Sequence, residues 1–229
     1  MIAHPDDTPA AKQKHEFLAG EGDQWFLRNQ AGLTGPSAIR DLVVSRIATQ
    51  LSANAQARVL EIGCGQGDNL DALARLAPIE AHGVDPSQAA VQAGRVAYPG
   101  LDLRTGTADA LPYEDASMDV VWFGFCLYLI DRSLLMRSVA EADRVLRDGG
   151  LLVIVDFDPD YPCVRPYHHR AGLHSYKMDH ARLFLANPAY TLVEKQATSH
   201  ATGRWHPDPQ ERVAVTLCRK TLAQGYRSV

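Results

Sequence analysis

Closely spaced cysteine pairs, long apolar runs and a strong excess of one charge are all missing from this 229-residue sequence. The first eight residues, Met1 to Thr8, are polar, and no stretch approaches the length of a membrane span. The scattered cysteines lack both the CxxC spacing of a zinc site and the density of a disulfide framework, which fits a reducing compartment. They are Cys64, Cys126, Cys163 and Cys218. We therefore expect a cytoplasmic protein with no membrane segment and no targeting peptide.

The charge balance is close to neutral, with 23 Lys and Arg against 27 Asp and Glu and a net charge of -4. This balance excludes a general attraction to nucleic acid or to an anionic membrane. With 46% hydrophobic residues, the length fits one α/β domain. We expect N-terminal lid helices over residues 1–55 and a main domain over 56–229 with an insertion at about 157–189, acting as a monomer or a homodimer.

Apolar periodicity divides the chain into predicted helices and strands. Residues from about 10 to 30 are expected to be partly helical. The four-residue spacing from Ile39 to Leu51 predicts a helix that begins near Ser37 and ends near residues 52–54. The letters L-R-D-G-G over residues 146–150 predict a helix end with a glycine cap. Strands are expected at 58–62, 79–84, 101–105, 118–123, 151–155, 191–199 and 212–219, the last two antiparallel.

The most informative stretch runs from Val59 to Leu70, where an apolar run ends in an acid, three alternating glycines follow, and a helix begins. The glycines allow positive φ and a close approach of a ligand to the main chain. The dinucleotide fingerprint G-x-G-x-x-G does not fit, because its sixth position is Asp68 here, and a carboxylate there would repel a phosphate. Glu61 is an acceptor placed for a cationic group. The turn therefore favours a cofactor with a positive amino group over NAD.

At these residues the segment resembles motif I of the class I S-adenosylmethionine-dependent methyltransferases, E/D-x-G-x-G-x-G. Three later features extend the resemblance over about residues 57–156: an acid one βα unit downstream at Asp85, a D-A-L-P stretch beginning at Asp109, and the L-R-D-G-G-x-L-x-I segment. The resemblance implies a three-layer, Rossmann-like α/β fold with a seven-stranded, mostly parallel sheet and an antiparallel strand at the end. It also implies S-adenosyl-L-methionine as cofactor and S-adenosyl-L-homocysteine as product.

The resemblance also implies which residues would hold the cofactor. Asp85 would accept from the ribose hydroxyls, a role that also fits the acid about 20 residues beyond a dinucleotide turn, and Asp109 from the adenine amino group. The N-terminal helices would form a lid in which Arg28 meets the methionine carboxylate. Trp25 and Asn29 would also face the substrate. The full predicted cofactor set is Trp25, Arg28, Glu61, Gly63, Cys64, Gly65, Gly67, Asn69, Asp85, Pro86, Ser87, Ala108, Asp109, Ala110, Phe125 and Tyr128.

The segment 161–178 contains basic residues and histidines but no Asp or Glu. A loop of one charge sign at the carboxyl end of a sheet is a candidate substrate region, which favours a small anionic substrate, and a solvated excursion with ordinary histidines is the alternative. The predicted substrate-binding residues here are Arg165, Arg170, Tyr176 and Lys177. The candidate general bases are His168, His169, His174, Tyr167 and Asp156. The histidine spacing fits no standard metal site, so no metal is expected.

Together these patterns predict transfer of a methyl group to an O or N atom of a small metabolite. The segment from Gly124 to Ile130 lacks the N/D-P-P-Y/F stretch of methylases that act on amino groups of nucleic acid. No nucleic-acid partner is therefore expected. A noncatalytic S-adenosylmethionine-binding module and a methyltransferase acting on protein or RNA are the alternatives.

Overall fold

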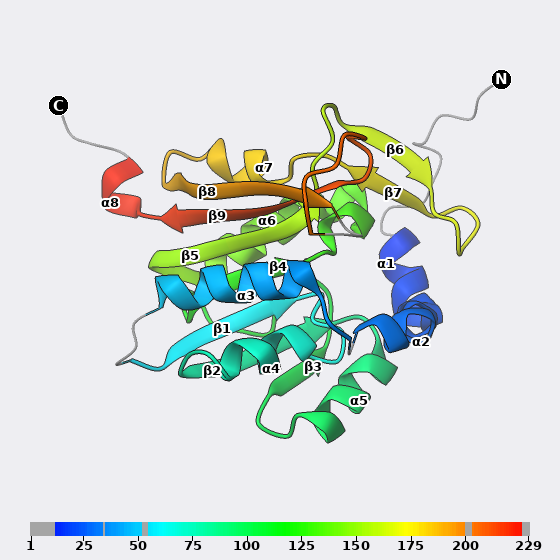
Figure 1. Cartoon of the computed structure of the whole chain (residues 1–229), viewed down its shortest axis with the longest axis horizontal. Helices are drawn as coiled ribbons and strands as arrows, with labels where there is room; N and C mark the ends of the chain where they lie inside the picture. Colours follow the sequence, from blue (N-terminus) through cyan, green and yellow to red (C-terminus); the bar gives the residue numbers. More distant parts are fainter. Residues whose placement is uncertain (1–11, 34, 52–54, 200–202, 226–229) are drawn as a thin grey trace.

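A computed structural model describes residues 12–33, 35–51, 55–199 and 203–225. Its centre is a seven-stranded sheet in the order β3-β2-β1-β4-β5-β9-β8 (Figure 1). Only β9 runs antiparallel to its neighbours in this sheet, one position in from the edge strand. The strands are β1 (Ala57–Ile62), β2 (Ile79–Asp85), β3 (Asp102–Thr105), β4 (Met118–Gly124), β5 (Leu146–Phe157), β8 (Tyr190–Ser199) and β9 (Arg212–Lys220). The predicted mostly parallel α/β sheet is confirmed.

Helices cover both faces of the sheet and bury a separate apolar core on each. The first face packs against α3 (Ala38–Gln50), α4 (Asp68–Ala74) and α5 (Gln88–Ala97), and the second against α6 (Arg132–Val145) and α7 (Ala181–Leu185). Alternation along β4 shows the division, because Trp122 belongs to the first core and its neighbour Phe123 to the second. Both side chains are buried.

Two smaller units lie at the carboxyl ends of the parallel strands. One is the N-terminal group of α1 (Lys12–Glu16), the π-helical turn η2 (Phe17–Glu21) and α2 (Gly22–Leu33). The other is a hairpin of β6 (Cys163–Pro166) and β7 (His174–Lys177). Figure 1 shows both units at the same end of the strands. The remaining elements are the 3-10 turn η3 (Leu127–Leu129) and the short helix α8 (Leu222–Gly225).

Most predicted elements are confirmed, and one boundary is wrong. Ser37 is the N-cap of α3, since its side chain accepts from the Arg40 N–H. The predicted glycine-capped helix end at 146–150 is wrong, because α6 already ends at Val145 and Leu146 pairs with Met118 as the first residue of β5. The predicted end of α3 at 52–54 and the N-terminal segment Met1 to Thr8 lie outside the described residues. No helix within the described ranges is long and apolar enough to cross a membrane.

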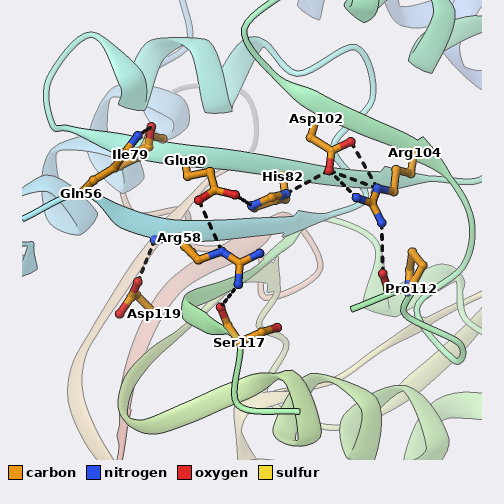
Figure 2. A network of polar contacts seen from close by, with 10 residues as sticks. All are labelled: Gln56, Arg58, Ile79, Glu80, His82, Asp102, Arg104, Pro112, Ser117 and Asp119. Atoms are coloured by element: carbon orange, nitrogen blue, oxygen red, sulfur yellow. Dashed lines mark hydrogen bonds and ion pairs between the residues drawn. The ribbon is translucent and has the colours of Figure 1, made fainter. Parts of the chain in front are cut away.

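A polar network ties β1, β2 and β3 together away from the carboxyl ends (Figure 2). His82 is buried between two carboxylates, with its Nε2 2.9 Å from Glu80 and its Nδ1 3.1 Å from Asp102. Arg58 and Arg104 flank these carboxylates at 3.5 and 2.6 Å. The network neutralises charge on strands whose carboxyl ends carry the residues described next.

Candidate functional site

Two cavities lie side by side over the carboxyl ends of the central strands. The smaller one, of about 130 Å³, is lined by Asp85, Asp109 and residues of α1 and α2. The larger one, of about 390 Å³, is lined by the glycine turn, the start of α3 and Asn69. Trp25, Gly63, Gly124 and Phe125 line both cavities. The two cavities therefore adjoin and together form the candidate site, at the sheet edge where ligands bind in open α/β folds.

The glycine turn joins β1 to α4 and needs glycine for two reasons. Gly63, Gly65 and Gly67 have φ values of +79°, +54° and +93°, in the region that other residues seldom adopt. A side chain on Gly63 would also place its Cβ 2.7 Å from the Cβ of Cys126. Gly63 and Gly65 line the larger cavity and leave the main chain open to a ligand, whereas Gly67 is the N-cap residue of α4.

Glu61 is a buried carboxylate at the end of β1, as the sequence predicts for an acceptor. Its Oε1 accepts from Asn69 Nδ2 at 2.7 Å, while its Oε2 has no hydrogen-bond partner among the described residues. Burial raises its pKa to about 8, although the Asn69 hydrogen bond acts in the opposite direction. Gly124 leaves it room, because a Cβ there would lie within 2.4 Å of Oε1. A cationic group next to Glu61 would stabilise the ionised form.

Asp85 at the end of β2 links the glycine turn to α5. Its two oxygens accept from the N–H groups of Gly65, at 2.9 Å, and Ser87, at 2.8 Å. Burial raises its pKa to about 6 against these two hydrogen bonds. Ser87 in turn caps α5 and donates its hydroxyl to Asp23 of α2 at 2.7 Å. The N-terminal helices are thereby fixed to the carboxylate that was predicted to hold a ribose.

Asp109 lies in the smaller cavity and is only 4% exposed. Its Oδ2 is 2.7 Å from Nζ of Lys14, which comes from α1. Burial acts to raise the pKa of Asp109, but hydrogen bonds from Lys14 and Thr107 leave it below its ordinary value. Of its predicted neighbours, Ala108 lines the cavity and Ala110 does not.

Phe125 marks the point where the two cavities meet, directly after β4. Its φ of +59° is unusual for a bulky residue, a conformation that costs on the order of 1–3 kcal/mol. The ring packs against Tyr128 and Phe157 with centroid distances of 5.1 and 4.9 Å. Burial raises the pKa of Tyr128, which does not line a cavity. The aromatic packing, together with a hydrogen bond from the Phe125 N–H to the Val155 carbonyl, holds the strained turn in place.

Of the three predicted lid residues, two line a cavity and one does not. Trp25 lines both cavities and Asn29 lines the larger one, as expected for residues that face ligands. Arg28 lines neither cavity, and its guanidinium instead contacts Glu21 and the Tyr167 hydroxyl. The cation that does reach the larger cavity is Arg40 of α3, which the sequence reading missed.

Arg40 is held next to the glycine turn by hydrogen bonds to Asn69 and Gly35. It donates to Asn69 Oδ1 at 3.1 Å and to the carbonyl of Gly35 at 3.0 Å. Asn69 also donates to Glu61, so an acid and a cation share this amide at the edge of the larger cavity. The only sequence signal for Arg40 was its place in the first turn of a helix that directly precedes β1.

Several residues predicted for substrate binding are engaged elsewhere. Arg170 forms an ion pair with Glu16 at 2.6 Å. Lys177 is buried, with its Nζ 3.6 Å from the centre of the Phe157 ring and 3.0 Å from the Gln210 carbonyl. The guanidinium of Arg132 lies 4.5 Å from the centre of the Tyr176 ring. Arg165 is exposed on β6. The hairpin therefore presents fewer free cations than its sequence suggests.

None of the predicted general bases lines either cavity. His168 and His169 are exposed in the β6–β7 turn, and the ring of His174 packs near Tyr176. Asp156 is buried and accepts from the N–H groups of Phe157, at 2.7 Å, and Tyr128, at 3.2 Å. Its oxygens thus hold the backbone of two of the three packed aromatic residues, Phe125, Tyr128 and Phe157. Within the described ranges, no cluster of three or more His, Cys, Asp or Glu side chains is arranged to hold a metal ion.

The strand order, the glycine turn and the three carboxylates define a domain of the class I methyltransferase type. Residues 60–154 match the family model described as "Methyltransferase domain". A probable S-adenosylmethionine-dependent methyltransferase of Mycolicibacterium smegmatis is 34% identical over 176 residues, which cover 73% of this chain and 61% of that protein. These matches identify a class I S-adenosylmethionine-dependent methyltransferase domain in this chain.

Two further similarities concern a curated relative and a solved structure. A phthiotriol/phenolphthiotriol dimycocerosates methyltransferase of Mycobacterium ulcerans is 38% identical over 117 residues, which cover 50% of this chain and 42% of that protein. The chain thus spans between about two fifths and three fifths of these relatives. The 1,6-didemethyltoxoflavin-N1-methyltransferase of Burkholderia thailandensis, solved with S-adenosylhomocysteine, superposes with a TM-score of 0.68 over 96% of this chain and 92% of that chain, at 16% identity. This last likeness supports the fold alone.

Proposed function

We propose that this chain transfers a methyl group from S-adenosyl-L-methionine to an O or N atom of a small molecule. One observation carries the proposal: Asp85 and Asp109 line the smaller cavity, while Glu61, which is buried and lines neither cavity, accepts a hydrogen bond from Asn69 at the edge of the larger one. Three acceptors in this arrangement complement a ligand with an ammonium group, ribose hydroxyls and an exocyclic amino group. The names of the relatives, which are methyltransferases, support the same chemistry.

The residues present fit the cofactor at its amino-acid end. The unpartnered Oε2 of Glu61 is a buried acceptor for the ammonium group, and Arg40 is the nearby cation for the carboxylate. Arg40 therefore takes the role that the sequence assigned to Arg28. The cofactor supplies an already activated methyl group on its sulfonium. The chain's task is to hold donor and acceptor in line, which is worth at most about 7–11 kcal/mol.

The acceptor site proposed here lies beside Phe125 and Trp25, where the two cavities meet. Their aromatic surface favours a flat or apolar acceptor, and the relative that is named for a heteroaromatic substrate offers a precedent. An anionic group on that molecule would meet the exposed Arg165 and the hairpin histidines. Arg170 and Lys177 do not support this part of the proposal, because each already has a partner.

A general base is needed for a hydroxyl or a protonated amine and would contribute about a hundredfold or more. We propose His168, His169 and His174 for this role with a substrate that reaches from the cavities to the hairpin, because all three lie outside both cavities. Tyr167 is less suited, because burial raises its pKa to about 12. Asp156 is less suited as well, because its oxygens already accept from two backbone N–H groups.

Thermal unfolding with S-adenosylhomocysteine tests the proposal, with NAD as the control ligand. At about 100 times its Kd, a ligand stabilises the folded state by roughly 2.7 kcal/mol, which corresponds to roughly 5–10 °C for a domain of this size. We expect this shift with S-adenosylhomocysteine and none with NAD. A shift with NAD alone, or with neither compound, would contradict the assignment of the glycine turn.

A protein that binds S-adenosylhomocysteine without transferring methyl groups would support the noncatalytic alternative. Radiolabelled S-adenosylmethionine offered with a panel of aromatic amines, phenols and carboxylic acids separates the two. Label in a small product supports the enzyme, and label in added protein or RNA points to a macromolecular substrate.

A further inference from the structure

The smaller cavity contains a cation that comes from far away in the sequence. Lys14 of α1 and Asp109 both line it, with Nζ 2.7 Å from Oδ2. The Asp109 side chain is 5% exposed and that of Lys14 is 30% exposed. Lys14 lies outside the family match over residues 60–154. Its position is therefore a property of this chain's own N-terminal segment.

The backbone around Lys14 is fixed by contacts with three other elements. The two oxygens of Asp131 accept from the backbone N–H groups of Gln13, at 3.0 Å, and Lys14, at 2.8 Å. The buried side chain of Gln13 donates to the Leu129 carbonyl at 2.6 Å and accepts from the His174 N–H at 2.7 Å. These four bonds tie α1 to the N-cap of α6, to the η3 turn and to β7. Lys14 is thus presented to the cavity by a held main chain, although α1 has only five residues.

The pair offers a carboxylate acceptor next to an ammonium donor. A carboxylate has about four acceptor positions and an ammonium has three donors, so each keeps capacity after they bind each other. The amino edge of adenine has the complementary order, because its exocyclic donor is flanked on either side by a ring nitrogen acceptor. Asp109 alone would satisfy only the amino group.

We propose that Lys14 is a specificity-determining residue that donates to a ring nitrogen beside the adenine amino group while Asp109 accepts from that amino group. The inference rests on the proposed function, since it assumes that the nucleoside half of the cofactor fills the smaller cavity. It makes the N-terminal segment part of the nucleobase site, in addition to its predicted place as a lid.

The test compares Lys14→Met with Lys12→Met, a matched change two residues away whose ammonium lies against Gly172 and outside both cavities. Calorimetry gives Kd for S-adenosylhomocysteine and for its 1-deaza and 7-deaza analogues, each of which lacks one ring nitrogen. We expect Lys14→Met to weaken S-adenosylhomocysteine binding about 10-fold, the value of one charge-assisted hydrogen bond, and Lys12→Met to leave it unchanged.

The deaza analogues separate a direct contact from a structural role. The Lys14→Met penalty should vanish for the analogue that lacks the accepted nitrogen and persist for the other one. An equal loss of affinity for all three ligands, or no loss, would overturn the inference. As long as the wild type binds S-adenosylhomocysteine, the proposed function would still stand. Absence of wild-type binding would overturn both. Lys14→Gln, which keeps a donor, should lose less affinity than Lys14→Met, and it serves in its place if Lys14→Met unfolds.

Discussion

Glu61→Gln is expected to weaken S-adenosylhomocysteine binding about 100-fold and at the same time to stabilise the ligand-free protein. The affinity falls because a buried carboxylate that would pair with the ligand's ammonium group becomes a neutral amide. The stability rises because the fully buried Glu61, with a pKa of about 8, costs free energy to keep in the fold at neutral pH. After allowing for an amide donor without a partner, the net gain is on the order of 2 kcal/mol. Calorimetry and urea unfolding at pH 8 measure the two effects.

The pH dependence of the ligand-free protein provides the control for this substitution. The folded pKa of Glu61 is raised above its ordinary 4.5 to about 8, so the folded state keeps a proton that the unfolded state has lost. Stability therefore falls as pH rises through that interval. Asp156, whose pKa burial raises to about 7, adds to the fall in the same direction. His180, whose pKa burial lowers to about 3, acts in the opposite direction but only below about pH 6.5.

Between pH 6.5 and 8 we expect the wild type to lose about 2 kcal/mol of unfolding free energy. Glu61→Gln should lose less than half of that, mainly from Asp156 and to a smaller extent from Asp85. A wild-type stability that rises over this interval would show that Glu61 is ionised in the ligand-free fold. A variant that binds S-adenosylhomocysteine as tightly as the wild type would remove Glu61 from the site.

The sequence was most informative where chemistry and backbone geometry coincide in a few adjacent residues. The glycine turn requires positive φ at Gly63, Gly65 and Gly67, and the structure has it at all three. Glu61, Asp85 and Asp109 could be anticipated because parallel strands bring their carboxyl ends to one edge of the sheet. Continuous apolar and β-branched runs likewise predicted the strands, while the helix end before β5 was placed too late. There the pairing of Leu146 with Met118 outweighed the local preference of the two glycines for a helix cap.

Side chains that reach the site from distant segments could not be predicted in the same way. The sequence pointed to Arg28 and not to Arg40, and the choice between them depends on how α2 and α3 pack. Arg28 forms an ion pair with Glu21, and Arg40 donates a hydrogen bond to Asn69. The basic segment 161–178 lost part of its apparent charge because Glu16, far away in the sequence, pairs with Arg170. A one-dimensional pattern shows which charges are present but not which of them neutralise one another across the fold.

Gly94→Ala is expected to destabilise the protein by about 3 kcal/mol, although alanine is normally the better residue inside a helix. A Cβ on Gly94 would lie 2.2 Å from the backbone oxygen of Gln66 and 2.4 Å from Cδ1 of Leu103. The backbone of the glycine turn would have to move, because an oxygen of the main chain cannot rotate away as a flexible side chain can. We expect the midpoint of thermal unfolding to fall by roughly 6–12 °C.

Gly32→Ala in α2 is the matched control for stability, since a Cβ there meets no atom of the described residues within 4 Å. It should stabilise the fold by about 0.5–1 kcal/mol through the ordinary helix preference for alanine. Gly94→Ala should also weaken S-adenosylhomocysteine binding, because Gln66 lies between Gly65 and Gly67 in the turn that lines the larger cavity. If both substitutions raised the unfolding free energy equally, α5 would not pack against the turn as closely as its contacts indicate. A loss of stability with Gly94→Ala and a gain with Gly32→Ala would show that α5 packs tightly against the glycine turn. Weaker S-adenosylhomocysteine binding by Gly94→Ala would show that this packing also holds the turn in the shape that the cofactor needs.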